Sequence, residues 1–191
     1  MKYNIVIVGV GGQGTLLASK ILGGIALSQG LDVKVSEIHG MAQRGGSVIT
    51  HVRMGDEVFA PLVSPGEADY ILAFEWLEAL RSEYFLKEDG LLIANTQRIM
   101  PMPVILGDAP YPEQEAAVKC LCMDAYHMAC EAGSARSVNM VLLGVLSKFL
   151  PFEQEVWEET IEKIVPPKTL DTNYRAFRAG RDIAHKQGAN V

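Results

Sequence analysis

The stretch YNIVIVGVGGQG, residues 3–14, decides the fold of this 191-residue chain. Residues 3–8 are almost wholly apolar, which is typical of a central parallel strand covered by helices on both faces. Glycines follow at once, and residues 14–29 then repeat apolar side chains at helical spacing until Gly30 ends the helix. The alternating segment 31–37 predicts a second strand, so the chain opens with a β-α-β unit.

The rest of the chain continues to alternate strands with helices. Residues 47–63 are predicted to form a strand, a Gly-Asp turn and a short extension, as an edge hairpin. Further strands are predicted at 68–74, 91–96, 104–106 and 118–123, and helices at 75–86, 124–131, 136–150, 152–165 and 173–188. This pattern predicts an α/β, Rossmann-like fold with a mostly parallel sheet and helices on both faces. Residues 1–191 are assigned to one domain, in which the helices from about residue 151 form an added packing or interface element.

Composition excludes several classes of protein. The apolar fraction of 49% and the charged fraction of 21% are those of a folded globular protein. A net charge of −6 without a lysine or arginine cluster argues against nucleic acid as the main partner. No apolar stretch is long enough for a membrane span, and the first strand is too short for a signal sequence. We therefore expect a cytoplasmic protein.

The three cysteines, Cys120, Cys122 and Cys130, are odd in number and lie in an apolar segment. This favours reduced, buried thiols rather than a disulfide framework. Their C-x-C-x7-C spacing matches no common zinc or iron–sulfur site. No metal site is predicted in this chain.

The glycine turn supports two interpretations. Gly9, Gly11 and Gly14 satisfy G-x-G-x-x-G, with Gly12 as an extra glycine, and such a turn brings a helix N-terminus close to an anion. Glu37, at the end of the second predicted strand, could bind a ribose hydroxyl, which makes NAD binding a hypothesis. The alternative is that the glycines only allow the strand and the helix to pack closely.

The segment HGMAQRGGSVITHV, residues 39–52, places Arg44 between Gln43 and two glycines. A guanidinium presented in this way could grip a phosphate or carboxylate with two hydrogen bonds, and the alternative is a surface turn. A structural role is the better interpretation for His39 and His51, with His39 the stronger exception. The sequence contains no nucleophile elbow, paired-carboxylate motif or P-loop lysine, so no catalytic residue is assigned.

Three motifs in order carry a family resemblance. They are IVGVGGQG with Gln13, EIHGMAQRGGSV, and RSVNMVLLG around Asn139. Together they resemble the gamma-type domain of the 2-oxoacid:ferredoxin oxidoreductases, and within that family the small (beta) subunits of the indolepyruvate ferredoxin oxidoreductases. The resemblance spans residues 3 to about 150, and HGMAQRGG is its most specific element.

The resemblance implies a subunit of an enzyme that oxidatively decarboxylates aryl-2-oxoacids with coenzyme A, giving acyl-CoA, carbon dioxide and reduced ferredoxin. Thiamine diphosphate and iron–sulfur clusters are then expected in a large (alpha) partner subunit, with no cofactor held tightly by this chain. The residues that motif matching assigns to cofactor or coenzyme A contact are Gly9, Gly11, Gly12, Gln13, Gly14, Arg44, Gly45, Gly46 and Asn139. The alternative is a stand-alone NAD-binding dehydrogenase or redox sensor.

Overall fold

The computed structural model describes residues 2–40 and 46–186 and is built around a six-stranded sheet. The strands are β1 (Lys2–Val10), β2 (Asp32–His39), β3 (Ser47–Gly55), β4 (Ala68–Ala73), β5 (Leu86–Asn95) and β6 (Cys120–Met123). Their order across the sheet is β2-β3-β1-β4-β5-β6. Strands β1, β4, β5 and β6 pair in parallel, whereas β3 is antiparallel to both of its neighbours. The predicted α/β fold with a mostly parallel sheet is confirmed.

Strand β3 is where the topology departs from the prediction. Instead of an edge hairpin, residues 47–63 contain a single strand, which lies inside the sheet between β1 and β2. Val52 of β3 pairs with Ile5 on one side and Val35 on the other. The edge prediction was wrong because alternation along a segment reports which side chains are buried, not which strands lie beside it.

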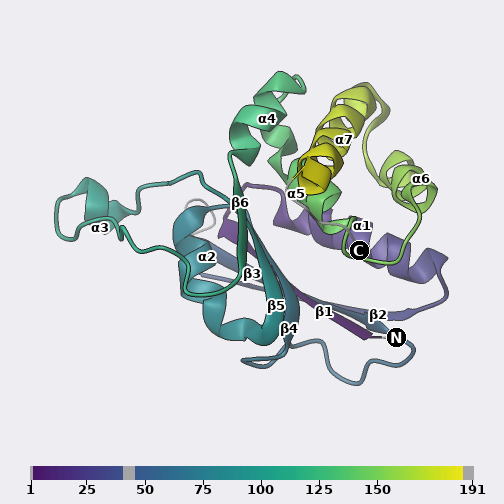
Figure 1. Cartoon of the computed structure of the whole chain (residues 1–191), viewed down its shortest axis with the longest axis horizontal. Helices are drawn as coiled ribbons and strands as arrows, with labels where there is room; N and C mark the ends of the chain where they lie inside the picture. The colour runs from purple at the N-terminus through teal and green to yellow at the C-terminus, as the bar shows by residue number, and fades with distance from the viewer. Residues whose placement is uncertain (1, 41–45, 187–191) are drawn as a thin grey trace.

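Helices cover both faces of the sheet, as predicted. They are α1 (Thr15–Ser28), α2 (Trp76–Ser82), α3 (Met102–Ile105), α4 (Ala125–Glu131), α5 (Val138–Leu146), α6 (Gln154–Ile164) and α7 (Leu170–Lys186), with short 3-10 turns η1 (Glu83–Phe85), η2 (Ala135–Ser137) and η3 (Pro167–Thr169). Figure 1 shows α1, α5, α6 and α7 on one face and α2 on the other. None of these helices is both long and apolar enough to cross a membrane within the part of the chain that the structure describes.

The larger hydrophobic core lies between the sheet and the helices α1 and α4 to α7. Every residue of α5 is buried, as expected of a helix that is apolar around its whole circumference. Trp157 of α6 and Phe177 of α7 are both 0% exposed, and their rings stack with centroids 5.7 Å apart. The two C-terminal helices therefore bury their apolar faces in the same core as β1 and α1.

The segment around α3 corrects a second prediction. Residues 104–106 were expected to form a short strand, but α3 is a helical turn held by the amide of Ile105, which donates to the carbonyl of Pro101 at 3.1 Å. Pro103 lies in the first turn, where a helix needs no proline N–H. Figure 1 shows α3 well away from the other helices, on a long connection between β5 and β6.

Candidate functional site: the glycine turn and its neighbours

The glycine turn between β1 and α1 lies at the carboxyl ends of the parallel strands, where ligands of such sheets bind. Gln13 folds back into this turn. Its Oε1 accepts from the amide of Val10 at 2.7 Å, and its Nε2 donates to the carbonyl of Phe74, just beyond β4, at 3.1 Å. The structure therefore uses both ends of the Gln13 amide to tie the turn to the neighbouring strand. Contact between Gln13 and a cofactor remains a prediction.

Asn139 of α5 lies against the same turn, 125 residues away in sequence from Gly14. Gly14 has a φ of +88°, and a Cβ there would lie 2.7 Å from the Asn139 Nδ2. That nitrogen donates to the Gly14 carbonyl at 3.4 Å, and Asn139 is only 2% exposed. The structure thus joins the first and third motifs of the resemblance, and it gives Asn139 a packing role.

The other glycines of the turn differ in what surrounds them. A Cβ on Gly9 would lie 2.8 Å from Gln13 Oε1 and 3.1 Å from the Phe74 Cβ, so Gly9 allows the turn to close. Gly12 has a φ of +100° and no atom within 4 Å of a would-be Cβ. Gly12 is therefore the position at which a ligand could approach the backbone most closely.

The segment around Arg44 that connects β2 to β3, here called the arginine loop, is hydrogen-bonded to the glycine turn through Gly46. Arg44 and Gly45 lie outside the described residues. The carbonyl of Gly46 accepts from the amide of Gly11 at 3.0 Å, and the amide of Gly40 donates to the carbonyl of Ser47 at 3.3 Å. Both predicted binding loops therefore start from the same edge of the sheet and are bonded to each other.

A cavity of about 480 Å³ opens at this edge. It is lined by Gly11, Gly12, Gly14, Thr15, Leu16, Glu37, His39 and Val48. Thr15, the first residue of α1, is 7% exposed, and its hydroxyl makes no hydrogen bond to another described residue. A free hydroxyl beside the N-terminus of a 14-residue helix suits a phosphate or carboxylate. Motif matching missed Thr15, although its place directly after the glycine turn pointed to it.

Glu37 also lines this cavity, but its carboxylate accepts from the hydroxyl of Thr50 on β3 at 3.2 Å. His39 is exposed at the end of β2, whereas His51 is 3% exposed and its Nδ1 accepts from the amide of Val63 at 3.3 Å. Burial, and secondarily the charge of Arg53, lowers the pKa of His51 below its ordinary value. This environment fits the predicted structural role of His51.

Two buried carboxylates that line one pocket with Ser47, the first residue of β3, were not singled out from the sequence. Glu75, 1% exposed, caps α2 by accepting from the amide of Glu78 at 3.0 Å. Its other oxygen accepts from the amide of Ile99 at 2.9 Å and from the hydroxyl of Tyr111 at 2.8 Å. Burial, and then the contact with Glu75, raises the pKa of Tyr111 well above its ordinary value. Glu75 thus holds both ends of the proline-rich stretch 99–112, which lies between β5 and β6.

Glu78 anchors the base of the arginine loop. It is 4% exposed and accepts from Arg81 at 2.7 Å and from the hydroxyl of Ser47, the first residue of β3. Its charge is therefore balanced within the protein. Local sequence showed only a helix with acidic residues in its first turn, because the partner at Ser47 is 31 residues away.

The cysteines correct a third prediction. Cys120 and Cys122 are joined by a disulfide, and Cys130 is exposed rather than buried. Residues two apart on a strand point to one face, and the Cα atoms of Cys120 and Cys122 are 5.8 Å apart, within reach of a disulfide. An odd number of cysteines did not exclude one local pair. Among residues 2–40 and 46–186, no three His, Cys, Asp or Glu side chains gather where they could hold a metal ion.

Residues 4–183 match the family model described as pyruvate ferredoxin/flavodoxin oxidoreductase. The chain belongs to this oxidoreductase family. It is 46% identical to indolepyruvate oxidoreductase subunit IorB of Thermococcus kodakarensis, with 94% of each chain covered. The family and the enzyme class that the three motifs predicted are confirmed.

Solved structures of oxidoreductases are similar in fold. The gamma subunit of a keto/oxoacid ferredoxin oxidoreductase from Geobacter sulfurreducens has a TM-score of 0.75 at 23% identity, covering 96% of this chain and 99% of that one. A 2-oxoglutarate:ferredoxin oxidoreductase from Magnetococcus marinus, solved with 2-oxoglutarate, coenzyme A and succinyl-CoA bound, has a TM-score of 0.75 at 22% identity. That match covers 97% of this chain and 31% of the other. At these identities the two structures support the fold alone.

Proposed function

We propose that this chain is the small subunit of an enzyme that oxidatively decarboxylates indolepyruvate and related aryl-2-oxoacids. The reaction joins the remaining acyl group to coenzyme A, releases carbon dioxide and passes electrons to ferredoxin. The main support is the 46% identity to an indolepyruvate oxidoreductase subunit over 94% of both chains. The complex acts in the cytoplasm.

In this proposal the large subunit carries thiamine diphosphate and the iron–sulfur clusters, which supply the decarboxylation and electron-transfer chemistry. Ferredoxin meets the complex through that subunit. The small subunit contributes no catalytic residue. Its part is to hold an anion and to support the partner at the edge where the glycine turn and the arginine loop meet.

The observation that carries this role is the bond between the two loops, from the Gly11 amide to the Gly46 carbonyl at 3.0 Å. It brings Gly46, two residues after Arg44 in the sequence, to the edge that also presents Gly12 and the Thr15 hydroxyl. A guanidinium, a helix N-terminus and a hydroxyl together suit the phosphates of coenzyme A. Gly9, Gln13, Gly14 and Asn139 then shape this site, and Gly45 and Gly46 present the arginine.

The test is Arg44→Ala in the enzyme reconstituted from both subunits. The isolated variant should unfold within about 0.5 kcal/mol of the original chain, because surface changes rarely cost more. In the complex, a lost charge-assisted hydrogen bond should cost on the order of 1.5–3 kcal/mol. That cost appears as a coenzyme A requirement raised roughly 10- to 100-fold, or as equally weakened subunit association. Each variant is titrated against the large subunit, and dye reduction driven by indolepyruvate is measured at several coenzyme A concentrations, which gives both quantities.

Arg175→Ala is the matched control, because Arg175 pairs with Asp171 on the exposed side of α7. It should leave coenzyme A dependence and assembly unchanged. Wild-type assembly and activity in Arg44→Ala would reduce the arginine loop to a surface turn. Activity on pyruvate or 2-oxoglutarate but not on indolepyruvate would instead overturn the proposed substrate.

A further inference from the structure

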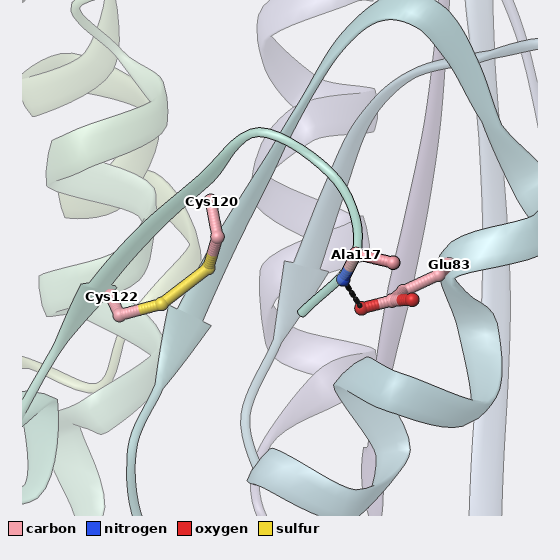
Figure 2. Close-up of a disulfide and its surroundings, with 4 residues drawn as sticks. All are labelled: Glu83, Ala117, Cys120 and Cys122. Atoms are coloured by element: carbon pink, nitrogen blue, oxygen red, sulfur yellow. Dashed lines mark hydrogen bonds between the residues drawn. A yellow bond between two sulfur atoms is a disulfide. The ribbon is translucent and has the colours of Figure 1, made fainter. Parts of the chain in front are cut away.

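Strand β6 carries a disulfide at the edge of the sheet. Cys120 and Cys122 are separated by Leu121 alone, and Figure 2 shows their bond lying along the strand. Strand β6 is last in the strand order and pairs with β5, in the register Leu92 to Cys120 and Ala94 to Cys122. Its other side pairs with no strand among the described residues.

The two cysteines share one face of the strand. Both are half-buried and pack against the smaller hydrophobic cluster, on the side of the sheet covered by α2. Leu121 points the other way and packs against the larger core. The segment just before β6 is held in place separately, because the amide of Ala117 donates to Glu83 Oε1 at 3.1 Å, as Figure 2 shows.

This disulfide is poorly placed to stabilise the fold. The stabilisation that a disulfide provides by restricting the unfolded chain grows with the length of the loop it closes. Here the closed loop holds three residues, Cys120 to Cys122, a sequence separation of 2. The same residues are already ordered by pairing with β5 and by the anchor at Ala117. Breaking the bond should therefore leave β6 where it is.

The surroundings do favour exchange. A thiolate attacks one sulfur of a disulfide through a mixed-disulfide intermediate, so the sulfur must be reachable. Exposed disulfides are more readily reduced than enclosed ones, and Cys120 and Cys122 are only partly buried on an edge strand. When the disulfide breaks, the two thiols stay side by side, because the strand holds both on one face. Re-formation is then fast and local.

We propose that Cys120 and Cys122 form a reversible two-electron redox site whose reaction partner is a dithiol or its disulfide. A thiolate of the incoming dithiol attacks one Sγ, breaks the bond between the cysteines and forms a mixed disulfide. The partner's second thiolate then attacks the partner's own sulfur in that mixed disulfide and expels the cysteine thiolate of β6. The partner leaves as a cyclic disulfide. Two electrons and two protons pass to β6, which ends with two thiols, and the reverse reaction restores the bond.

The test uses the purified full chain in anaerobic buffers that contain reduced and oxidised dithiothreitol in varied ratios. After acid quenching, alkylation and chymotryptic digestion, which can cut after Tyr126, mass spectrometry follows the peptide that holds Cys120 and Cys122 but not Cys130. It should carry no adduct at the oxidising end and two at the reducing end. The change should follow a single two-electron transition and reverse when the ratio is reversed. Circular dichroism should show the same fold in both forms.

Cys130→Ser is the matched control, because Cys130 is exposed and free. It should remove the adduct that Cys130 carries in every buffer and leave the redox transition of Cys120 and Cys122 unchanged. Cys122→Ser should abolish that transition while the fold is kept. Two adducts on the peptide in every buffer would overturn the proposal, as would a bond that is reduced only after denaturation, a fold lost on reduction, or a transition that requires Cys130.

Discussion

Gln13 shows how a single polar side chain can be taken up by the structure of a binding loop. The carbonyl of Phe74 accepts from Gln13 Nε2 at 3.1 Å and from Asn95 Nδ2 at 3.0 Å. These two amides join the glycine turn to the ends of β4 and β5. A buried carbonyl with two donors is sensitive to the loss of either, since an unpaired polar group costs free energy. Gln13 therefore contributes to folding whether or not it also touches a ligand.

Gln13→Glu tests the contribution of the Gln13 hydrogen bonds to stability, because it replaces only the donor nitrogen Nε2 with an oxygen. A carboxylate can still accept from the Val10 amide, but it places an oxygen against the Phe74 carbonyl and loses the donor. We expect the free energy of unfolding to fall by about 1–3 kcal/mol, measured by urea denaturation. Gln114→Glu, at an exposed position, is the control and should change little. Equal stability of the two variants would show that the Gln13 hydrogen bonds do not matter.

At the scale of elements, helices α5 and α7 cross so closely that only glycine fits at the two contact positions, Gly144 and Gly180. A Cβ on Gly144 would lie 2.0 Å from the carbonyl oxygen of Phe177, and one on Gly180 would lie 1.9 Å from that of Val141. Neither glycine has a positive φ, so the reason for glycine is space rather than backbone conformation. The backbones of the two helices touch directly, and this contact attaches the C-terminal helix to the core.

Gly144→Ala should therefore destabilise the chain, although alanine favours helices. Helix propensity alone would stabilise by about 1 kcal/mol, whereas an overpacked core costs about 1–3 kcal/mol or more. Gly23→Ala in α1 is the control, because nothing lies within 4 Å of its added Cβ. We expect urea denaturation to give opposite signs for the two variants. Stabilisation by both would mean that α5 and α7 do not cross closely.

At the scale of the whole molecule, the position of β3 bears on what the edge can bind. In a dinucleotide-binding sheet the acidic residue ends the strand next to β1. Here β3 lies between, so Glu37 on β2 is displaced outward by one further strand, roughly 4.8 Å. Its carboxylate also accepts from Thr50. The glycine turn is present, but Glu37 lies one strand too far out to bind the ribose hydroxyls of a dinucleotide at that turn.

NADH should accordingly fail to stabilise the isolated chain. A ligand at 100 times its dissociation constant adds about 2.7 kcal/mol to folding stability, which is readily seen as a rise in melting temperature. We expect no rise with millimolar NADH in a thermal denaturation experiment. A clear rise that disappears in Glu37→Lys would support the stand-alone dehydrogenase instead.

Much of the local structure follows from neighbouring residues. Periodicity located β1, α1, β2 and the buried helix α5, because it reports burial within one segment. The Asp124 side chain accepts from the amide of His127 at 2.8 Å, and Gly133 has a φ of +111°, so local chemistry sets both ends of α4. The ordered motifs were likewise sufficient to identify the family. The strand predicted at 104–106, within the proline-rich stretch 99–112, was a local error, since proline suits a first helical turn as well as an extended strand.

Tertiary structure alone decided the rest, because those features depend on residues far apart in the chain. The insertion of β3, the Glu78 contact with Ser47 and the Asn139 contact with Gly14 all join distant segments, and no local pattern specifies which partners meet. The disulfide differs from these features, because it joins two residues that are close together in the sequence. Its two residues lie two positions apart on one strand, yet only the placement of β6 at the sheet edge leaves both of them partly exposed, which the proposed exchange with an external thiol requires.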